Sequence, residues 1–127
     1  MGYNLIFLSL AAICNAIMDT LQFHFETSVF SKLNKNYWNP NISWRNKYIN
    51  GDIKLGRIKI LWIFDKPVML TDAWHLFKSL MITFLFLSIF TFNIKLNYWY
   101  TILILFAVYK VIWGIYFEAF YKFILRR

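Results

Sequence analysis

The chain has 127 residues, of which 60% are hydrophobic and only 16% are charged. Soluble domains are about 45–50% apolar, so this composition excludes an ordinary soluble globular domain. The 14 basic residues outnumber the six acidic ones and give a net charge of +8, which would suit either nucleic acid or anionic lipid as a partner.

Three apolar stretches, residues 3–21, 73–92 and 98–120, set the predicted architecture. A helix rises 1.5 Å per residue, so about 20 apolar residues cross about 30 Å of hydrocarbon. Each stretch reaches that length. The sequence therefore predicts an all-α membrane protein with three transmembrane helices, in which residues 1–127 form a single integral membrane domain.

The first helix is expected to continue past its apolar stretch, because no Gly or Pro interrupts it before the Asn-rich segment, and to end near Ser31. It lacks a basic region before the apolar run and a small-x-small cleavage site, so we expect a retained helix and not a signal peptide. Cys14 is the only cysteine, which excludes an intramolecular disulfide and a cysteine metal cluster. We expect Cys14 to be a small, buried hydrophobic side chain.

The loop of residues 31–70 carries eight basic and two acidic residues. Positive residues close to helix ends resist translocation, so this loop is predicted to be cytoplasmic. The N-terminus would then lie outside, and the C-terminus, with Lys122, Arg126 and Arg127, would lie in the cytoplasm. The predicted location is the inner (cytoplasmic) membrane, crossed several times.

Residues 34–50 combine Asn and Pro turn formers with aromatic and basic side chains, a composition that predicts an ordered interfacial loop. It resembles single-strand nucleic-acid platforms in composition alone. Its position between spans favours the bilayer and its anionic headgroups as partner, and no nucleic acid. The residues expected to face headgroups are Trp38, Trp44, Arg45 and Lys47.

Residues 53–64 are apolar but too short to span a membrane, and basic residues interrupt them. Both an in-plane helix and a short β-ribbon remain open. Pro67 should end this segment. Thr71 is the expected N-cap of the second helix, with Asp72 beside the positive end of its dipole.

The second and third helices are predicted to form a tight antiparallel hairpin. Its turn, residues 93–97, carries Lys95 and would lie outside. The aromatic residues that follow, Tyr98, Trp99 and Tyr100, would sit in the aromatic belt of that interface.

Polar residues recur at spacings of three or four on each predicted helix, so those of one helix share a face. In the predicted orientation all of them approach the cytoplasmic interface, and they are expected to form one intramembrane polar cluster. Its members are Asn15, Asp19, Gln22, Glu26, Asp72, His75, Ser79, Lys110 and Glu118.

Lys110 is the deepest charge of this predicted cluster. An ionised side chain facing lipid at the helix centre costs about 2.5–3.5 kcal/mol, so Lys110 needs a carboxylate partner. Asp19 is the first choice and Glu118 the second. Gly114 would permit close helix approach. This interpretation makes the cluster an ion-paired network that holds three helices together.

The same residues also suit a metal site. Asp72 and His75 place a carboxylate and an imidazole on one helical face, and Asp19, Glu26 and Glu118 would complete an oxygen-rich shell for a divalent ion. There is no H-E-x-x-H motif, and a capping Asp beside a satisfied His is the simpler explanation. No cofactor is predicted beyond a possible divalent metal. His24 falls on the opposite side of the first helix and is not expected to be a ligand.

Three segments resemble those of uncharacterised, small integral membrane proteins of bacteria with low-GC genomes. They are residues 15–20 (Asn-Ala-Ile-Met-Asp-Thr), 38–48 (Trp-Asn-Pro-Asn-Ile-Ser-Trp-Arg-Asn-Lys-Tyr) and 71–78 (Thr-Asp-Ala-Trp-His-Leu-Phe-Lys). The resemblance carries no known activity. It implies that loop and cluster form one site at the cytoplasmic face, with Trp38, Trp44 and Lys47 above Asp72 and His75.

Three functions follow as hypotheses. The first is a non-enzymatic membrane component that assembles with itself or with a membrane protein partner, because three helices enclose little interior. The second is a membrane-embedded, metal-dependent enzyme acting on a lipid or headgroup, with Asp72 and His75 as ligands and Glu26 or Asp19 as ligand or base. The third is a small pore or holin-like protein.

Overall fold

The computed structural model describes residues 2–92 and 98–126, and most of the chain is helical. Within the described residues, three helices are long and apolar enough to cross a membrane. They are α1 (Gly2–His24), α4 (Ala73–Phe90) and α5 (Trp99–Glu118). The three predicted apolar helices are therefore confirmed by length and composition.

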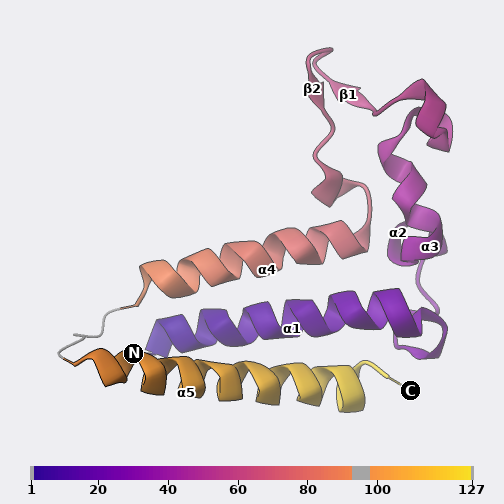
Figure 1. The fold of residues 1–127 in the computed structure, drawn as a ribbon. Helices are drawn as coiled ribbons and strands as arrows, with labels where there is room; N and C mark the ends of the chain where they lie inside the picture. The colour runs from indigo at the N-terminus through magenta and orange to yellow at the C-terminus, as the bar shows by residue number, and fades with distance from the viewer. Residues whose placement is uncertain (1, 93–97, 127) are drawn as a thin grey trace.

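Helix α1 lies between α4 and α5 and contacts both (Figure 1). Ala11, Ala12 and Ala16 on α1 are fully buried, and small side chains of this kind let neighbouring helices approach closely. Cys14 is buried and free. Helices α4 and α5 are antiparallel, but the expected tight hairpin is wrong, because α1 packs between them.

The end of α1 differs from the prediction. The α-helix ends at His24, and a single 3-10 turn, Phe25–Thr27, follows it in place of the predicted extension towards Ser31. The hydroxyl of Ser28 donates to the carbonyl of Phe25 at 2.7 Å and accepts from the amide of Phe30 at 3.2 Å. Local bonds of this type compete with the helical ladder. They turn Phe25 and Phe30 into the core.

Short elements fill the loop between α1 and α4. Asn34 and Asn39 cap two brief helices, each side chain accepting an amide two residues later at 3.0 Å. The helices are α2 (Lys35–Trp38) and α3 (Pro40–Ser43), followed by 3-10 turns at Trp44–Lys47, Ile49–Gly51 and Ile53–Leu55. The recurrent Asn residues thus act as local caps.

Of the two conformations open for residues 53–64, the chain adopts the ribbon. Strand β1 (Lys59–Ile60) pairs antiparallel with β2 (Phe64–Asp65), with Lys59 opposite Asp65. The hairpin stands off the three-helix bundle, at the end where α1 finishes and α4 begins (Figure 1). The fold is thus helical apart from this short arm, within the described residues.

A 3-10 turn, Val68–Leu70, leads into α4, whose N-cap is Asp72 and not Thr71 as expected. The Thr71 hydroxyl donates back to the carbonyl of Val68 at 2.7 Å, so it closes the preceding turn. The carboxylate of Asp72 accepts the amide of His75 at 2.9 Å. Its negative charge suits the positive end of the helix dipole better than a hydroxyl does.

The last helix runs past its predicted end, because a π-helical turn, Ala119–Ile124, follows α5. The amide of Val29 donates to the carbonyl of Leu125 at 2.9 Å, which ties the C-terminal segment to the end of α1. Tyr98, Trp99 and Tyr100 are exposed at the opposite end. The predicted turn with Lys95, and Arg127, lie outside the described residues.

Candidate functional site

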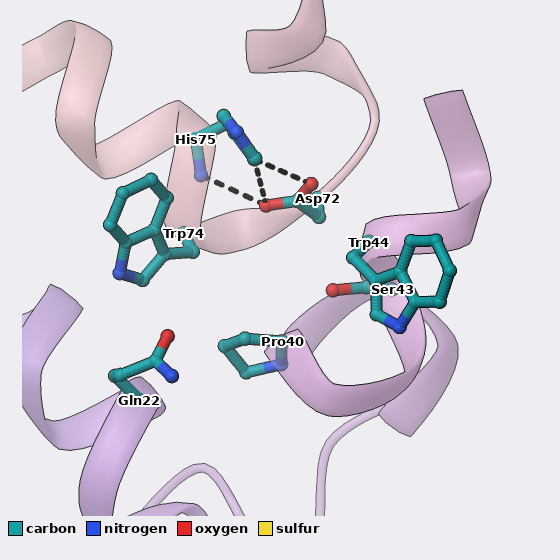
Figure 2. A pocket seen from close by; sticks show the side chains of 7 residues that line it. All are labelled: Gln22, Pro40, Ser43, Trp44, Asp72, Trp74 and His75. Atoms are coloured by element: carbon teal, nitrogen blue, oxygen red, sulfur yellow. Dashed lines mark hydrogen bonds and ion pairs between the residues drawn. The ribbon is translucent and has the colours of Figure 1, made fainter. Parts of the chain in front are cut away.

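A pocket of about 180 Å³ lies where the end of α1, helix α3 and the start of α4 meet (Figure 2). It brings together residues from three parts of the sequence. The lining residues are Gln22, Pro40, Ser43, Trp44, Asp72, Trp74 and His75.

Asp72 is the centre of this pocket's hydrogen-bond network and is only 1% exposed. Both carboxylate oxygens lie within 2.7–2.9 Å of Nδ1 of His75, and one also accepts the hydroxyl of Thr71 at 3.1 Å. An ionised carboxylate only accepts, so Nδ1 of His75 is the donor in this pair. A buried carboxylate needs such partners to offset its lost hydration. Burial, followed by the charge of Asp72, raises the pKa of Tyr37 on α2.

Asn46 attaches the loop to the start of α4. Its side-chain amide donates to the carbonyl of Thr71 at 2.9 Å and to that of Asn36 at 2.6 Å. One side chain therefore bridges α2, the turn after α3 and the residue before the α4 cap. This bridge positions α3 beside Asp72.

The four residues expected to face headgroups do not share one environment. Trp38 packs into the core, its ring centroid 5.3 Å from that of Phe30 and 6.2 Å from that of Phe77. The expectation fails for Trp38, because the cap at Asn34 turns it inward. Trp44 lines the pocket with the guanidinium of Arg45 5.3 Å from its ring centroid. Lys47 lies over Tyr48.

Ser43 also lines the pocket, although no motif in the sequence marks it as a site residue. It is 1% exposed, and its hydroxyl has no hydrogen-bond partner among the described residues. Figure 2 shows that hydroxyl facing the space between Trp74 and Trp44. An unsatisfied buried hydroxyl costs about 1–3 kcal/mol, so the pocket is suited to receive a polar group. The only local sequence signal for the position of Ser43 is the start of α3, where the cap residue Asn39 is followed by Pro40.

Lys110 does not lie near Asp19. The side-chain amide of Asn4 donates to the hydroxyl of Tyr109, so Lys110 is level with the first turn of α1. Asp19 lies about four turns further along, roughly 22 Å at 1.5 Å per residue. Lys110 is exposed, with Nζ 5.9 Å from the ring centroid of Phe106. The expected ion pair is therefore wrong.

The two glutamates of the predicted cluster find lysines elsewhere. Glu118 pairs with Lys122 one turn later, and Glu26 pairs with Lys35 at 3.1 Å. Both pairs are exposed, where ion pairs contribute little to stability. Glu118 therefore forms no ion pair with Lys110 among the described residues.

The remaining polar residues of α1 and α4 also separate. Asn15 and Asp19 are partly buried on α1, and neither lines the pocket. Ser79 donates to Sδ of Met69 at 3.6 Å. Only Gln22, Asp72 and His75 of the predicted cluster share the pocket, because a common helix face does not set the depth at which two helices meet.

The donor set for a metal is incomplete. Within residues 2–92 and 98–126, no group of three or more His, Cys, Asp or Glu side chains could hold an ion. Asp72 and His75 do come together, but Asp19, Glu26 and Glu118 do not join them. His24 contacts Tyr121, on the C-terminal segment, and lies outside the pocket.

Comparisons with protein-family models, with curated proteins and with solved structures found no match. The resemblance to small bacterial membrane proteins therefore stays a prediction.

Proposed function

We propose that this chain is a small, non-enzymatic, multi-pass membrane component whose Asp72–His75 pair fixes an interfacial loop to one end of a three-helix bundle. The observation that carries this proposal is the set of structural bonds that the Asp72 carboxylate accepts. It caps α4, accepts from the His75 ring and accepts from Thr71. These bonds give the carboxylate a structural role at the start of α4, and this role supports a loop attachment in preference to catalysis.

The proposed orientation places the loop and the C-terminus in the cytoplasm and the N-terminus outside. Both basic regions support it, because the loop and the C-terminal segment lie at the same end of the bundle (Figure 1). Lys122 and Arg126 are exposed there. A concentration of positive charge at one end favours the cytoplasmic side of the inner membrane.

The alternative is a metal-dependent enzyme that acts on a lipid or headgroup. The unpartnered Ser43 hydroxyl beside Asp72 and His75 favours it, because this hydroxyl is free to bind a polar group. The missing ligands would have to come from another subunit.

Elemental analysis separates these two functions. Wild-type, His75→Ala and His24→Ala proteins are purified in mild detergent, and loosely bound metal is removed. His24 is the matched control, because it lies outside the pocket. We expect no stoichiometric metal in any of the three folded proteins. Stoichiometric metal in wild type and His24→Ala, lost in His75→Ala, would overturn the non-enzymatic proposal.

We also propose that the protein assembles with itself or with a membrane partner. Lys110 lies within a helix that is long and apolar enough to span a membrane, is exposed and has no carboxylate within ion-pair distance among the described residues. A partner that covers this charge would remove its exposure to lipid. Lys110→Ala should reduce the assembled size in detergent, whereas Lys122→Ala, which removes only a surface pair, should not. Equal sizes for wild type and Lys110→Ala would count against assembly through this face.

A pore or holin-like role would need several copies, because α1 packs between the other two helices with its alanines buried. It predicts that the purified protein releases a dye trapped in vesicles. Intact vesicles at high protein content would exclude this role.

A further inference from the structure

The tip of the β1–β2 hairpin exposes an unbroken apolar run. Leu61 is 76% exposed, Trp62 96%, Ile63 74% and Phe64 68%. The hairpin stands away from the bundle, so none of the long helices covers this run (Figure 1). A contiguous exposed apolar patch on a folded protein marks a surface that meets lipid or another molecule.

The hairpin has a defined shape. The amide of Lys66 donates to the carbonyl of Ile58 at 2.7 Å, and the amide of Ile58 donates to that of Lys47 at 3.0 Å. Leu61 and Trp62 turn the chain with φ values of 52° and 67°. Large L-residues adopt this left-handed region at a cost. Such strain is retained where the shape serves a purpose, and here it projects both side chains outward.

Positive charge flanks the apolar tip in the sequence. The arm formed by residues 52–66 carries four basic side chains (Lys54, Arg57, Lys59 and Lys66) and two acidic ones (Asp52 and Asp65). Asp65 pairs with Lys59 at 2.6 Å and with Arg57 at 3.8 Å. The arm therefore keeps a net positive charge, which attracts anionic headgroups.

We infer that residues 61–64 insert into the headgroup–acyl boundary of the leaflet beside the loop, while the flanking cations bind anionic phospholipid. This inference rests on the proposed membrane location of the three helices. Ala73, the first residue of α4, follows Asp65 by only eight positions, and a 3-10 turn shortens the chain between them. The tip therefore lies near the end of the bundle where α4 begins, as Figure 1 shows. Exposed Trp and aliphatic residues beside Lys and Arg are the composition of interfacial anchors.

A fluorescence experiment on the full-length chain tests this inference. Cys14→Ala provides a background free of native cysteine, and single cysteines replace Trp62, Leu103 or Asn50. Leu103 is exposed on α5 and reports on the spans, whereas Asn50 is exposed in a polar turn of the loop. Each cysteine carries an environment-sensitive dye. The proteins are reconstituted in vesicles of phosphatidylcholine and phosphatidylglycerol, with doxyl groups on the acyl chains as quenchers.

We expect doxyl lipids to quench most of the dye emission at positions 62 and 103 and little of it at position 50. Quenching at 103 without quenching at 62 would overturn the insertion and leave the membrane location intact. No quenching at 103 would overturn both. A blue-shifted but unquenched dye at 62 would show that protein covers the tip, which also overturns the inference.

One further variant and one further vesicle composition complete the test. Ile63→Cys repeats the measurement with Trp62 present, so the result does not depend on loss of that ring. Vesicles of phosphatidylcholine alone should reduce the quenching at position 63. Equal quenching in both vesicle types would overturn the part of the inference that assigns anionic headgroups to the cations.

Discussion

The side-chain amide of Asn4 donates a hydrogen bond to the hydroxyl of Tyr109, which joins the first turn of α1 to the middle of α5. The carbonyl of Asn4 also accepts the hydroxyl of Ser88 on α4 at 2.8 Å. A single buried residue thus links all three helices at one level. This level sets the register of α5 and places Lys110 far from Asp19.

Tyr109→Phe should lower the free energy of unfolding by about 1 kcal/mol, because it leaves the buried amide of Asn4 without its acceptor. Unfolding by a denaturing detergent, followed by circular dichroism, measures the change. Tyr116→Phe is the matched control on the same helix, since Tyr116 is exposed. Equal stabilities for the two variants would show that the Asn4 bond contributes nothing.

Asp72 should tolerate Asn better than Ala. Asp72→Ala removes the α4 cap and leaves His75 Nδ1 unpaired, so we expect a loss of about 2–4 kcal/mol. Asp72→Asn keeps a capping oxygen and should cost about half as much. The same unfolding assay applies, with Asp52→Ala as control, because Asp52 caps only an exposed turn at Lys54. A larger loss in Asp72→Asn than in Asp72→Ala would contradict the capping role.

Removal of two serine hydroxyls should have opposite effects. Ser43→Ala deletes a buried hydroxyl that has no partner among the described residues, so stability should stay equal or rise by up to about 1 kcal/mol. Ser88→Ala deletes a hydroxyl that donates to Asn4 and should destabilise. A marked loss of stability in Ser43→Ala, measured without added lipid, would mean that this hydroxyl is satisfied in the protein.

The raised pKa of Tyr37 predicts that the protein loses stability at alkaline pH. Its pKa is raised in the folded protein, by burial and then by Asp72. As pH rises, the unfolded chain therefore releases the Tyr37 proton before the folded protein does. The contribution of protonated Tyr37 to the free energy of unfolding is complete below the ordinary tyrosine pKa of about 10, and it is lost as pH rises through the pKa of Tyr37 in the folded protein. A spectroscopic titration of wild type minus Tyr37→Phe isolates the group. Asp72→Asn should lower the Tyr37 pKa but leave it above the ordinary value; no change would exclude the charge of Asp72 as a cause.

Some features follow from the sequence alone. The three apolar helices depend on length and composition, because transfer of a helix to hydrocarbon is governed by the side chains it carries. The caps at Asn34 and Asn39 are also local, since each bond spans two residues. For residues 53–64 the sequence left an in-plane helix and a ribbon open, and the chain adopts the ribbon, next to residues 56–58 that pair with residues 47–49.

Tertiary structure alone decided which polar residues meet. Helical spacing predicts which residues of one helix share a face, yet depth along the bundle depends on contacts such as Asn4 with Tyr109, which join residues 105 positions apart. The pocket likewise depends on Asn46, whose bonds bring Ser43 and Trp44 to Asp72. Periodicity describes rotation about a helix axis and contains no information on translation along it, and this is why the partner of Lys110 was predicted wrongly. Asp72 and His75 meet for a local reason, because Asp72 caps the helix that carries His75.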